Sequence, residues 1–277
     1  MLEDGQEYLE TQFKLPATQP KEPATVVRIY PSREELPANL LRFYIYFSSP
    51  MRNGFAQDAL GLIAEDGRQV EGALMHFKQE LWSPDNKRLT VLFDPGRIKR
   101  GVSTNLQVGP ALREGESYRL IVDSEWENAQ GVKLERGYEK QFRVGPALRS
   151  VPDPSKWQMT LPSANSFEEL TIEFMRPFDH ALLRRMFEVS DDEGNVVVGT
   201  ITVDKMETRW RFRPTNPWQH GDYVVAVDAT LEDLAGNNLQ GLLDRPVDDE
   251  LSGAASINLR LRFATSYPPG MGESAIR

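Results

Sequence analysis

The chain has 277 residues, of which 40% are hydrophobic and 26% are charged, and it carries a formal net charge of -9 with no cysteine. That length and composition are typical of a globular protein with about two cores. An acidic surface repels phosphate backbones, so nucleic acid is not expected as a partner. Without cysteine the chain has no disulfides, thiol nucleophiles or cysteine-based metal sites.

The N-terminal residues 1–23 are predicted to form a polar leader. Their first stretch, MLEDGQEYLETQ, lacks the basic start and the apolar stretch of a signal peptide. No apolar run approaches the roughly 20 residues that a membrane-spanning helix needs, so no membrane span is expected. The protein is therefore either cytoplasmic or exported through a signal that this sequence does not contain.

Residues 24–145 are predicted to form a first β-sandwich. Phe43, Ile45 and Phe47 alternate with residues of the opposite face, which is the period of a half-buried antiparallel strand. Similar strands follow, separated by turn sequences such as EDGR. Short strands with a turn every 8–12 residues or so favour a sandwich over alternating strands and helices. Helix is scarce, and only residues 54–60 and 180–187 are expected to form a turn or two.

An insertion at residues 96–109, GRIKRGVSTNLQVG, interrupts this first sandwich. Its basic residues Arg97, Lys99 and Arg100 stand out in an acidic chain, and long loops on a sandwich often carry binding function. One interpretation is a loop that binds an anionic ligand or an acidic partner. The other is a solvated loop, or one that packs against the second domain through its arginines.

The second half repeats the strand pattern of the first. FYIYFSSPM and LTIEFMRPF share a frame in which Phe47 aligns with Phe174, an offset of 127 residues. A repeat of this length indicates tandem domains rather than a solenoid. Residues 146–266 are therefore predicted to form a second sandwich, and residues 267–277 a flexible tail.

The junction between the predicted sandwiches, residues 146–157, contains three prolines. Proline fixes its own φ and restricts the residue before it, so we expect a fairly fixed orientation between the domains. The hexapeptide VGPALR overlaps this junction at 144–149 and also overlaps the end of the insertion at 108–113. The two copies do not occupy equivalent positions in the repeat. We interpret them as coincidence or as a shared preference for a proline turn.

A tyrosine follows a turn at the same place in each half. Tyr118 comes after Gly115 and Tyr223 after Gly221, and each opens an alternating strand. The arrangement resembles the tyrosine corner of immunoglobulin-like sandwiches. A tyrosine that only packs at a strand end is the alternative.

Several of these phrases together resemble the bacterial Ig-like domains found in tandem in secreted and surface proteins, including S-layer proteins. They are Phe-Ser-Ser-Pro-Met, the Asp-Gly hairpin, the glycine-then-tyrosine strand openings, and Asp-Leu-Ala-Gly-Asn-Asn-Leu at 233–239. The resemblance covers roughly residues 24–145 and 148–265, although the first half has Glu-Asn-Ala-Gln-Gly at 127–131 instead of the last phrase. It implies an all-β fold of two tandem immunoglobulin-like antiparallel β-sandwiches. By analogy it also implies a periplasmic or extracellular location.

An oxygen-rich turn in the second half is a candidate calcium site. Calcium takes about six to eight oxygen ligands, and Asp228, Asp233 and Asn237 offer oxygens within a short stretch. Such residues are also ordinary turn residues, so a simple turn is the alternative. None of the three histidines has metal-ligand spacing to another, and no other cofactor is expected.

Trp126 and Trp218 are candidate carbohydrate-binding residues. Both lie near predicted loops, and exposed aromatic faces can stack on sugar rings. The alternative is that they seal an interface between the domains.

The sequence predicts a non-catalytic module for structure, adhesion or binding in an exported or cell-envelope bacterial protein. A protein or a glycan at the cell surface is the expected partner. No GxSxG, Walker or HExxH motif occurs, so an enzyme is not expected. The alternatives are an accessory carbohydrate-binding module and a hydrolase with an acidic site between the domains.

Overall fold

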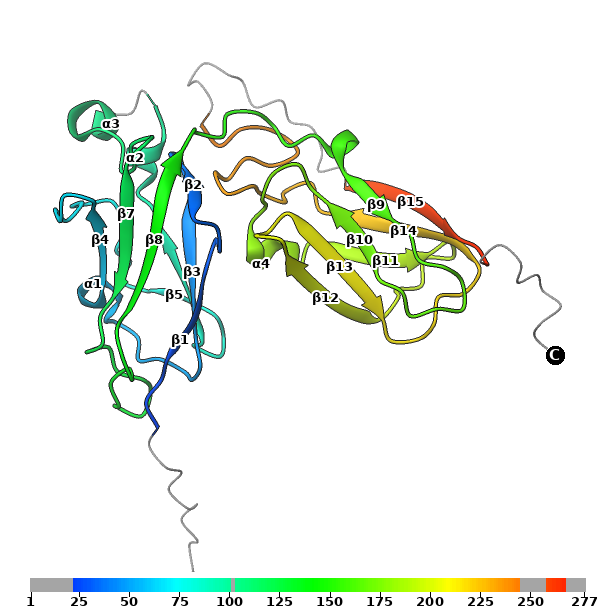
Figure 1. Cartoon of the computed structure of the whole chain (residues 1–277), viewed down its shortest axis with the longest axis horizontal. Helices are drawn as coiled ribbons and strands as arrows, with labels where there is room; N and C mark the ends of the chain where they lie inside the picture. The colour runs from blue at the N-terminus through cyan, green and yellow to red at the C-terminus, as the bar shows by residue number, and fades with distance from the viewer. Residues whose placement is uncertain (1–21, 101–102, 245–257, 268–277) are drawn as a thin grey trace, which may run out of the picture.

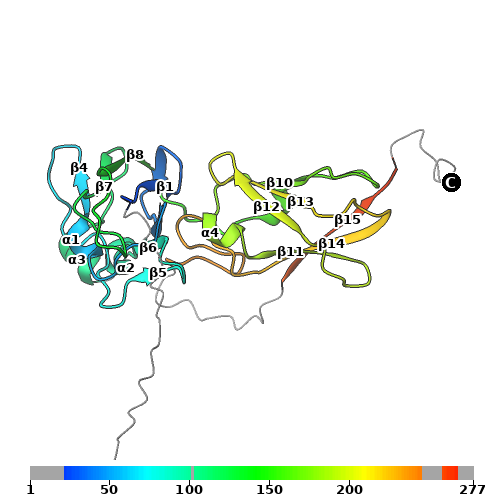
Figure 2. The same ribbon diagram turned by 90° about the horizontal axis from the view of Figure 1, so that it is seen from below.

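The computed structural model describes residues 22–100, 103–244 and 258–267. The predicted leader and tail lie almost entirely outside these ranges. Within them the chain forms two β-sandwiches in tandem, seen side by side in Figure 1 and from below in Figure 2. No helix in these ranges is long and apolar enough to cross a membrane.

The first sandwich consists of two four-stranded sheets. One sheet has the order β1-β3-β6-β5 and the other the order β2-β8-β7-β4. Neighbouring strands are antiparallel except β2 and β8, which are parallel. The strands are β1 (Val26–Tyr30), β2 (Glu35–Pro37), β3 (Arg42–Phe47), β4 (Leu60–Ala64), β5 (Leu81–Trp82), β6 (Arg88–Leu92), β7 (Ser117–Val122) and β8 (Tyr138–Gly145).

The second sandwich packs a four-stranded sheet against a three-stranded one. Their orders are β12-β13-β10-β9 and β11-β14-β15, with every neighbouring pair antiparallel. The strands are β9 (Gln158–Thr160), β10 (Leu170–Glu173), β11 (Phe187–Asp191), β12 (Gly199–Asp204), β13 (Arg209–Pro214), β14 (Gly221–Val227) and β15 (Leu259–Thr265).

These strand orders confirm the predicted immunoglobulin-like fold. Lettered A to G in chain order, the strands of the second sandwich divide into A-B-E-D and C-F-G, as in constant-type immunoglobulin domains. The first sandwich has the same division, with β2 as an added strand beside β8. The repeated phrase of the sequence therefore marks the B strand of each sandwich, which is β3 in one and β10 in the other.

Each sandwich has its own apolar core between its two sheets. The alternation of β3 places Phe43 and Ile45 inside, and that of β10 does the same for Leu170 and Ile172. Because successive side chains of a strand point to opposite faces, this period follows from the pleat itself. Leu234 comes from the second half of the chain but belongs to the first core. Part of the second half therefore packs on the first sandwich.

The predicted tyrosine corners are present in both sandwiches. The Tyr118 hydroxyl accepts a hydrogen bond from the backbone N–H of Arg113 at 3.2 Å. The Tyr223 hydroxyl accepts from the backbone N–H of Gln219 at 3.0 Å and lies 3.2 Å from its carbonyl. In each case the phenol bonds back to the backbone a few residues upstream, as the motif requires.

The insertion is not the simple loop that its sequence suggests. It contains two short helices, α2 (Pro95–Ile98) and α3 (Ser103–Val108), while residues 101–102 lie outside the described ranges. Asp94 caps α2 by accepting from the N–H of Gly96, and Pro95 occupies the first turn, where a missing N–H costs nothing. The other short helices are α1 (Ala56–Ala59), α4 (His180–Leu183) and the 3-10 turn η1 (Pro154–Lys156).

Candidate functional site

The two sandwiches meet through a set of buried polar contacts around α4, which lies at the end of the second sandwich that faces the first (Figures 1 and 2). The Tyr44 hydroxyl, on β3, donates to Asp179 Oδ2 at 2.8 Å. Arg42 Nε lies 3.5 Å from the same oxygen, and Arg42 also pairs with Glu232. Burial and the neighbouring carboxylate raise the pKa of Tyr44, which keeps the phenol protonated as a donor.

Asp179 is held in place by its own helix. Its Oδ1 accepts from the backbone N–H groups of Ala181 and Leu182, both at 3.0 Å, and so caps the N-terminus of α4. The carboxylate of Asp179 therefore binds two elements. One oxygen accepts hydrogen bonds from α4, and the other accepts a hydrogen bond from β3 of the first sandwich. Asp179 is 4% exposed, and a buried carboxylate needs such partners to remain ionised at low cost.

His180 stacks on the first sandwich beside this contact. Its ring lies 3.5 Å from that of Tyr30, centroid to centroid, at an angle of 13°, and Tyr46 meets it edge-on. His180 is 6% exposed and its Nδ1 has no hydrogen-bond partner among the described residues. Burial lowers the pKa of His180 to about 4, and nearby positive charges act in the same direction. Those charges belong to Arg184, Arg28 and Arg88.

The turn between β12 and β13 forms a third contact. Lys205, Met206 and Glu207 all have positive φ, at 46°, 54° and 61°. Left-handed backbone costs a non-glycine residue roughly 1 kcal/mol, so three in succession need support from the surroundings. The Glu207 carboxylate supplies some of it by accepting the backbone N–H of Ser32 at 3.0 Å. Burial raises the pKa of Glu207, while bonds from Ser32 oppose the rise.

The predicted calcium turn is a hydrogen-bonded loop that contacts the first sandwich. Asp233 accepts from the backbone N–H groups of Ala235 and Asn237, from Asn237 Nδ2 and from Arg176. The next residue, Leu234, accepts the N–H of Leu41 at 2.9 Å. Both oxygens of Asp233 are thus in use, and one faces a cation already.

The remaining members of that set are held in hydrogen bonds within the protein. Asp228 accepts the N–H and hydroxyl of Thr230, at 2.8 and 2.7 Å, which closes a local turn. Asn237 uses its amide nitrogen on the Leu148 carbonyl and on Asp233. Within the described ranges, no group of three or more histidine, cysteine, aspartate or glutamate side chains is placed to hold a metal ion. The structure therefore favours the alternative that these are turn residues.

The tryptophan prediction is wrong as a carbohydrate platform. Trp126 is 2% exposed and Trp218 is 1% exposed, so neither presents the open ring face that a sugar needs. Trp126 packs on Phe47 and donates to the Arg52 carbonyl. Trp218 packs on Tyr223 and donates to the Glu168 carbonyl. Each indole lies in the core of its own sandwich. The sequence around a loop residue does not show whether its side chain turns into the core.

The basic residues of the insertion have separate environments. Arg97 is buried and donates to backbone carbonyls. Arg100 is exposed, and its Nε lies 2.8 Å from Asp244 Oδ2. Asp244 belongs to the segment between β14 and β15 of the second sandwich. Lys99 is partly exposed. Arg100 thus follows the second sequence interpretation, packing toward the second half of the chain, whereas Arg97 packs within the first sandwich.

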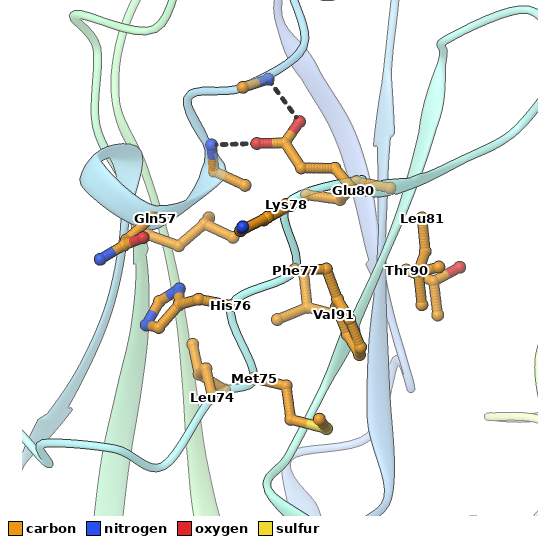
Figure 3. A pocket seen from close by; sticks show the side chains of 14 residues that line it. Gln57, Leu74, Met75, His76, Phe77, Lys78, Glu80, Leu81, Thr90 and Val91 are labelled. Carbon is orange, nitrogen blue, oxygen red and sulfur yellow. Dashed lines mark hydrogen bonds between the residues drawn. The ribbon is translucent and has the colours of Figure 1, made fainter.

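A pocket of about 200 Å³ opens at the side of the first sandwich, between α1 and the edge strand β5. Leu60, Leu89 and Val91 form an apolar floor, and Gln57, His76, Lys78 and Glu80 supply polar groups. Figure 3 shows the Glu80 carboxylate bound to the backbone N–H groups of Gly54 and Ala56, at 2.9 and 2.7 Å.

This edge pocket has room for one small ligand, but its best-placed carboxylate already has donors. Glu80 also accepts from the Trp82 indole at 2.7 Å, so it holds the turn before α1 rather than facing an empty site. Sequence reasoning did not single out these residues. The available signal is the run MHFKQE (75–80), which breaks the period-two pattern between two strands.

No family model matches the chain, and no curated protein matches it. Among solved structures, the S-layer protein rSbsC(31-844) aligns with 74% of this chain and 23% of its own, at 12% identity and a TM-score of 0.30. Native alpha-2-macroglobulin from Escherichia coli, spanning domains MG0-NIE-MG1, aligns with 75% of this chain and 66% of its own, at 12% identity and a TM-score of 0.30.

The FN1-FN3 domains of chicken CNTN1 align with 88% of this chain and 68% of their own length, at 12% identity and a TM-score of 0.24. The chain thus spans about a quarter of the S-layer protein that it matches. None of these alignments assigns a function to this chain.

Proposed function

We propose that this chain is a non-catalytic structural module of an exported or cell-envelope bacterial protein, related to the bacterial Ig-like domains, in which two sandwiches are held at one orientation. The single observation that carries the proposal is the polar contact between β3 and α4. Tyr44 and Arg42 of the first sandwich bind Asp179 of the second within a buried region. Domains that move freely share few contacts across their linker.

The energies of these contacts support a stiff unit. A hydrogen bond to a charged group contributes about 1.5–3 kcal/mol, and breaking it leaves a buried charge without its partner. The Leu41–Leu234 backbone bond and the Glu207–Ser32 bond lie on other segments of the same interface. Opening the interface therefore breaks several contacts together. A unit of this kind suits a spacer that presents a binding surface at a set distance.

The carboxylates between the sandwiches support a non-catalytic role over the hydrolase alternative. Asp179 and Glu207 are buried, and each accepts hydrogen bonds from protein donors. Glu232 is paired with Arg42. A glycosidase needs two carboxylates that face a substrate across a cleft. Hydrolytic activity that Asp179→Asn abolishes without loss of the fold would overturn this part of the proposal.

Spin labels can measure the orientation, because the chain has no native cysteine to interfere. Cysteines at Asp66 and Glu193, both in exposed hairpin turns, place one label on each sandwich. Double electron–electron resonance is expected to give one narrow distance distribution. Arg42→Ala is expected to broaden it, because the substitution strips Asp179 and Glu232 of their cation.

Arg119→Ala is the matched control, since Arg119 pairs with Glu139 within the first sandwich and both side chains are well exposed. It is expected to leave the distribution narrow. A broad distribution in the unsubstituted chain would refute the stiff module. The envelope location is tested separately by fractionating the cells that make the protein; recovery in the cytoplasm alone would refute it, whatever the labels report.

The proposed partner is a protein or a glycan at the cell surface. Loops and edges that a rigid sandwich presents are the usual binding surfaces of such folds. Pull-down from envelope extracts with the intact chain, and with the Arg42→Ala variant as comparison, tests whether binding depends on the orientation of the two sandwiches. Loss of binding in the variant is the expected result.

A further inference from the structure

Arg97 is a buried cation that no carboxylate neutralises. It is 6% exposed, and its guanidinium donates to the carbonyls of Gly109 at 2.6 Å, Glu71 at 2.9 Å and Pro110 at 3.3 Å. No ion pair joins it to an aspartate or glutamate among the described residues. Carbonyl dipoles solvate the charge but do not cancel it, and buried arginines are normally paired. The positive charge of Arg97 is therefore not balanced by any carboxylate side chain of the described residues.

The two VGPALR copies meet beside this arginine. Backbone hydrogen bonds join Gly115 to Val144 and Val144 to Glu116, at 2.8 and 2.9 Å, so the residues just after the first copy lie against the start of the second. In each copy the leucine, at 112 or 148, packs on the first core, and the arginine that follows it is exposed. From the sequence alone, the repeat is interpreted as coincidence or as a shared preference for a proline turn. In the fold it brings Arg113 and Arg149 to one place.

Those two arginines line a pocket of about 310 Å³ together with Arg97 and Arg100. Glu114 is the acidic side chain in the lining, and Asp244 offsets Arg100. Glu116 lies 3.9 Å from Arg113, but both side chains are well exposed, so that pair is worth little. Four arginines against these three acids leave the hollow with one positive charge in excess, in a chain whose net charge is -9.

We propose that this hollow, the arginine pocket, binds the tetrahedral oxyanion group of a small ligand, a phosphate or a sulfate. Guanidinium groups bind such groups through pairs of parallel hydrogen bonds. The arginines come from three segments of the chain and line one pocket, so an anion bound there can meet guanidinium groups from more than one side, which suits the several oxygens of a tetrahedral anion. The anion supplies the counter-charge that Arg97 lacks.

The test is a titration of the intact protein followed by the ¹H–¹⁵N signals of its arginine Nε–Hε groups. The probes are inorganic phosphate, inorganic sulfate, glucose 6-phosphate and, as the uncharged counterpart, glucose. The two inorganic anions report on the oxyanion alone, and glucose 6-phosphate reports on an oxyanion with a carrier. We expect saturable shifts of the Arg97 signal with the anions, and no shift with glucose.

The variants are Arg113→Gln and Arg149→Gln. Both side chains are exposed, so neither substitution is expected to change folding stability much. Each is expected to weaken anion binding by about tenfold or more, because a charge-assisted hydrogen bond is worth that much in a binding constant. Arg136→Gln removes the same charge from an exposed site outside the pocket. It is expected to leave binding within about twofold of the unsubstituted protein.

Three results would overturn the proposal. One is the absence of saturable shifts at millimolar anion concentrations. Another is equal weakening by Arg136→Gln and by the pocket variants, which would mean diffuse surface attraction. The third is a shift of the Arg97 signal with glucose equal to that with glucose 6-phosphate, which would mean that the charge is not recognised.

Discussion

Acidification is expected to weaken the contact between the sandwiches through His180. Its pKa is lowered from 6.5 to about 4, chiefly by burial. Above pH 6.5 the imidazole is neutral in both the folded and the unfolded chain, so it adds no pH dependence there. As the pH falls from about 6.5 toward about 4, the unfolded chain takes up the proton first, and folding stability is lost.

The size of this loss follows from the shift. One pKa unit corresponds to about 1.36 kcal/mol, so lowering the pKa of His180 from 6.5 to about 4 costs about 3 kcal/mol of folding stability by the time the pH has fallen to about 4. His180→Phe removes the titrating group and keeps an aromatic ring against Tyr30. The free energy of unfolding, measured by denaturant titration at neutral pH and at about pH 4, is expected to fall by about 3 kcal/mol more in the unsubstituted protein than in His180→Phe.

Other groups titrate in the same interval, and the comparison between variants removes their effect. His220 provides the matched control, because it is exposed where His180 is buried. His220→Phe is expected to show the same pH dependence as the unsubstituted protein. Equal losses in the unsubstituted protein and in His180→Phe would refute the reasoning, since His180 would then gain a proton as easily in the fold as outside it.

Three further predictions concern stability. Gly236 has φ +78°, and a Cβ there would lie 2.6 Å from Leu41 Cδ2 and 2.9 Å from Leu243 Cδ2. Gly194 has a similar φ of +88°, but a Cβ there would have no atom within 4 Å. Gly236→Ala is therefore expected to lower the free energy of unfolding by about 1–3 kcal/mol more than Gly194→Ala, and equal losses in denaturant unfolding would contradict this. Trp218→Ala is expected to lower the free energy of unfolding by about 3–5 kcal/mol, and a loss below about 1 kcal/mol would mean that the indole is not core. Glu207→Gln keeps an acceptor for the Ser32 N–H and removes a buried negative charge. The raised pKa of Glu207 indicates that burial disfavours this charge. At neutral pH the free energy of unfolding of Glu207→Gln is expected to equal or exceed that of the unsubstituted protein. Any advantage is expected to disappear in acid, where Glu207 is itself protonated and neutral. A clear drop at neutral pH would show that the charge itself is needed.

The sequence alone was enough for the fold of each half. The alternation in β3 and β10, the glycine turns and the tyrosines at the start of β7 and β14 are local patterns, and each reports the face or turn of its own segment. The short helices at 56–59 and 180–183 also fell within the predicted stretches. The helices of the insertion were missed, because its glycines and clustered basic residues are typical of a loop.

Only the tertiary structure decided which residues form the sites. Trp126 reads as a loop residue, and its burial depends on how two sheets close over it. Asp179 and Tyr44 lie 135 positions apart, and their bond exists because one sandwich rests against the other. Arg113 and Arg149 share a pocket because strand pairing brings two distant copies of one hexapeptide together. Periodicity records which way a side chain points from its own strand, whereas a site depends on the partner that packing places opposite it.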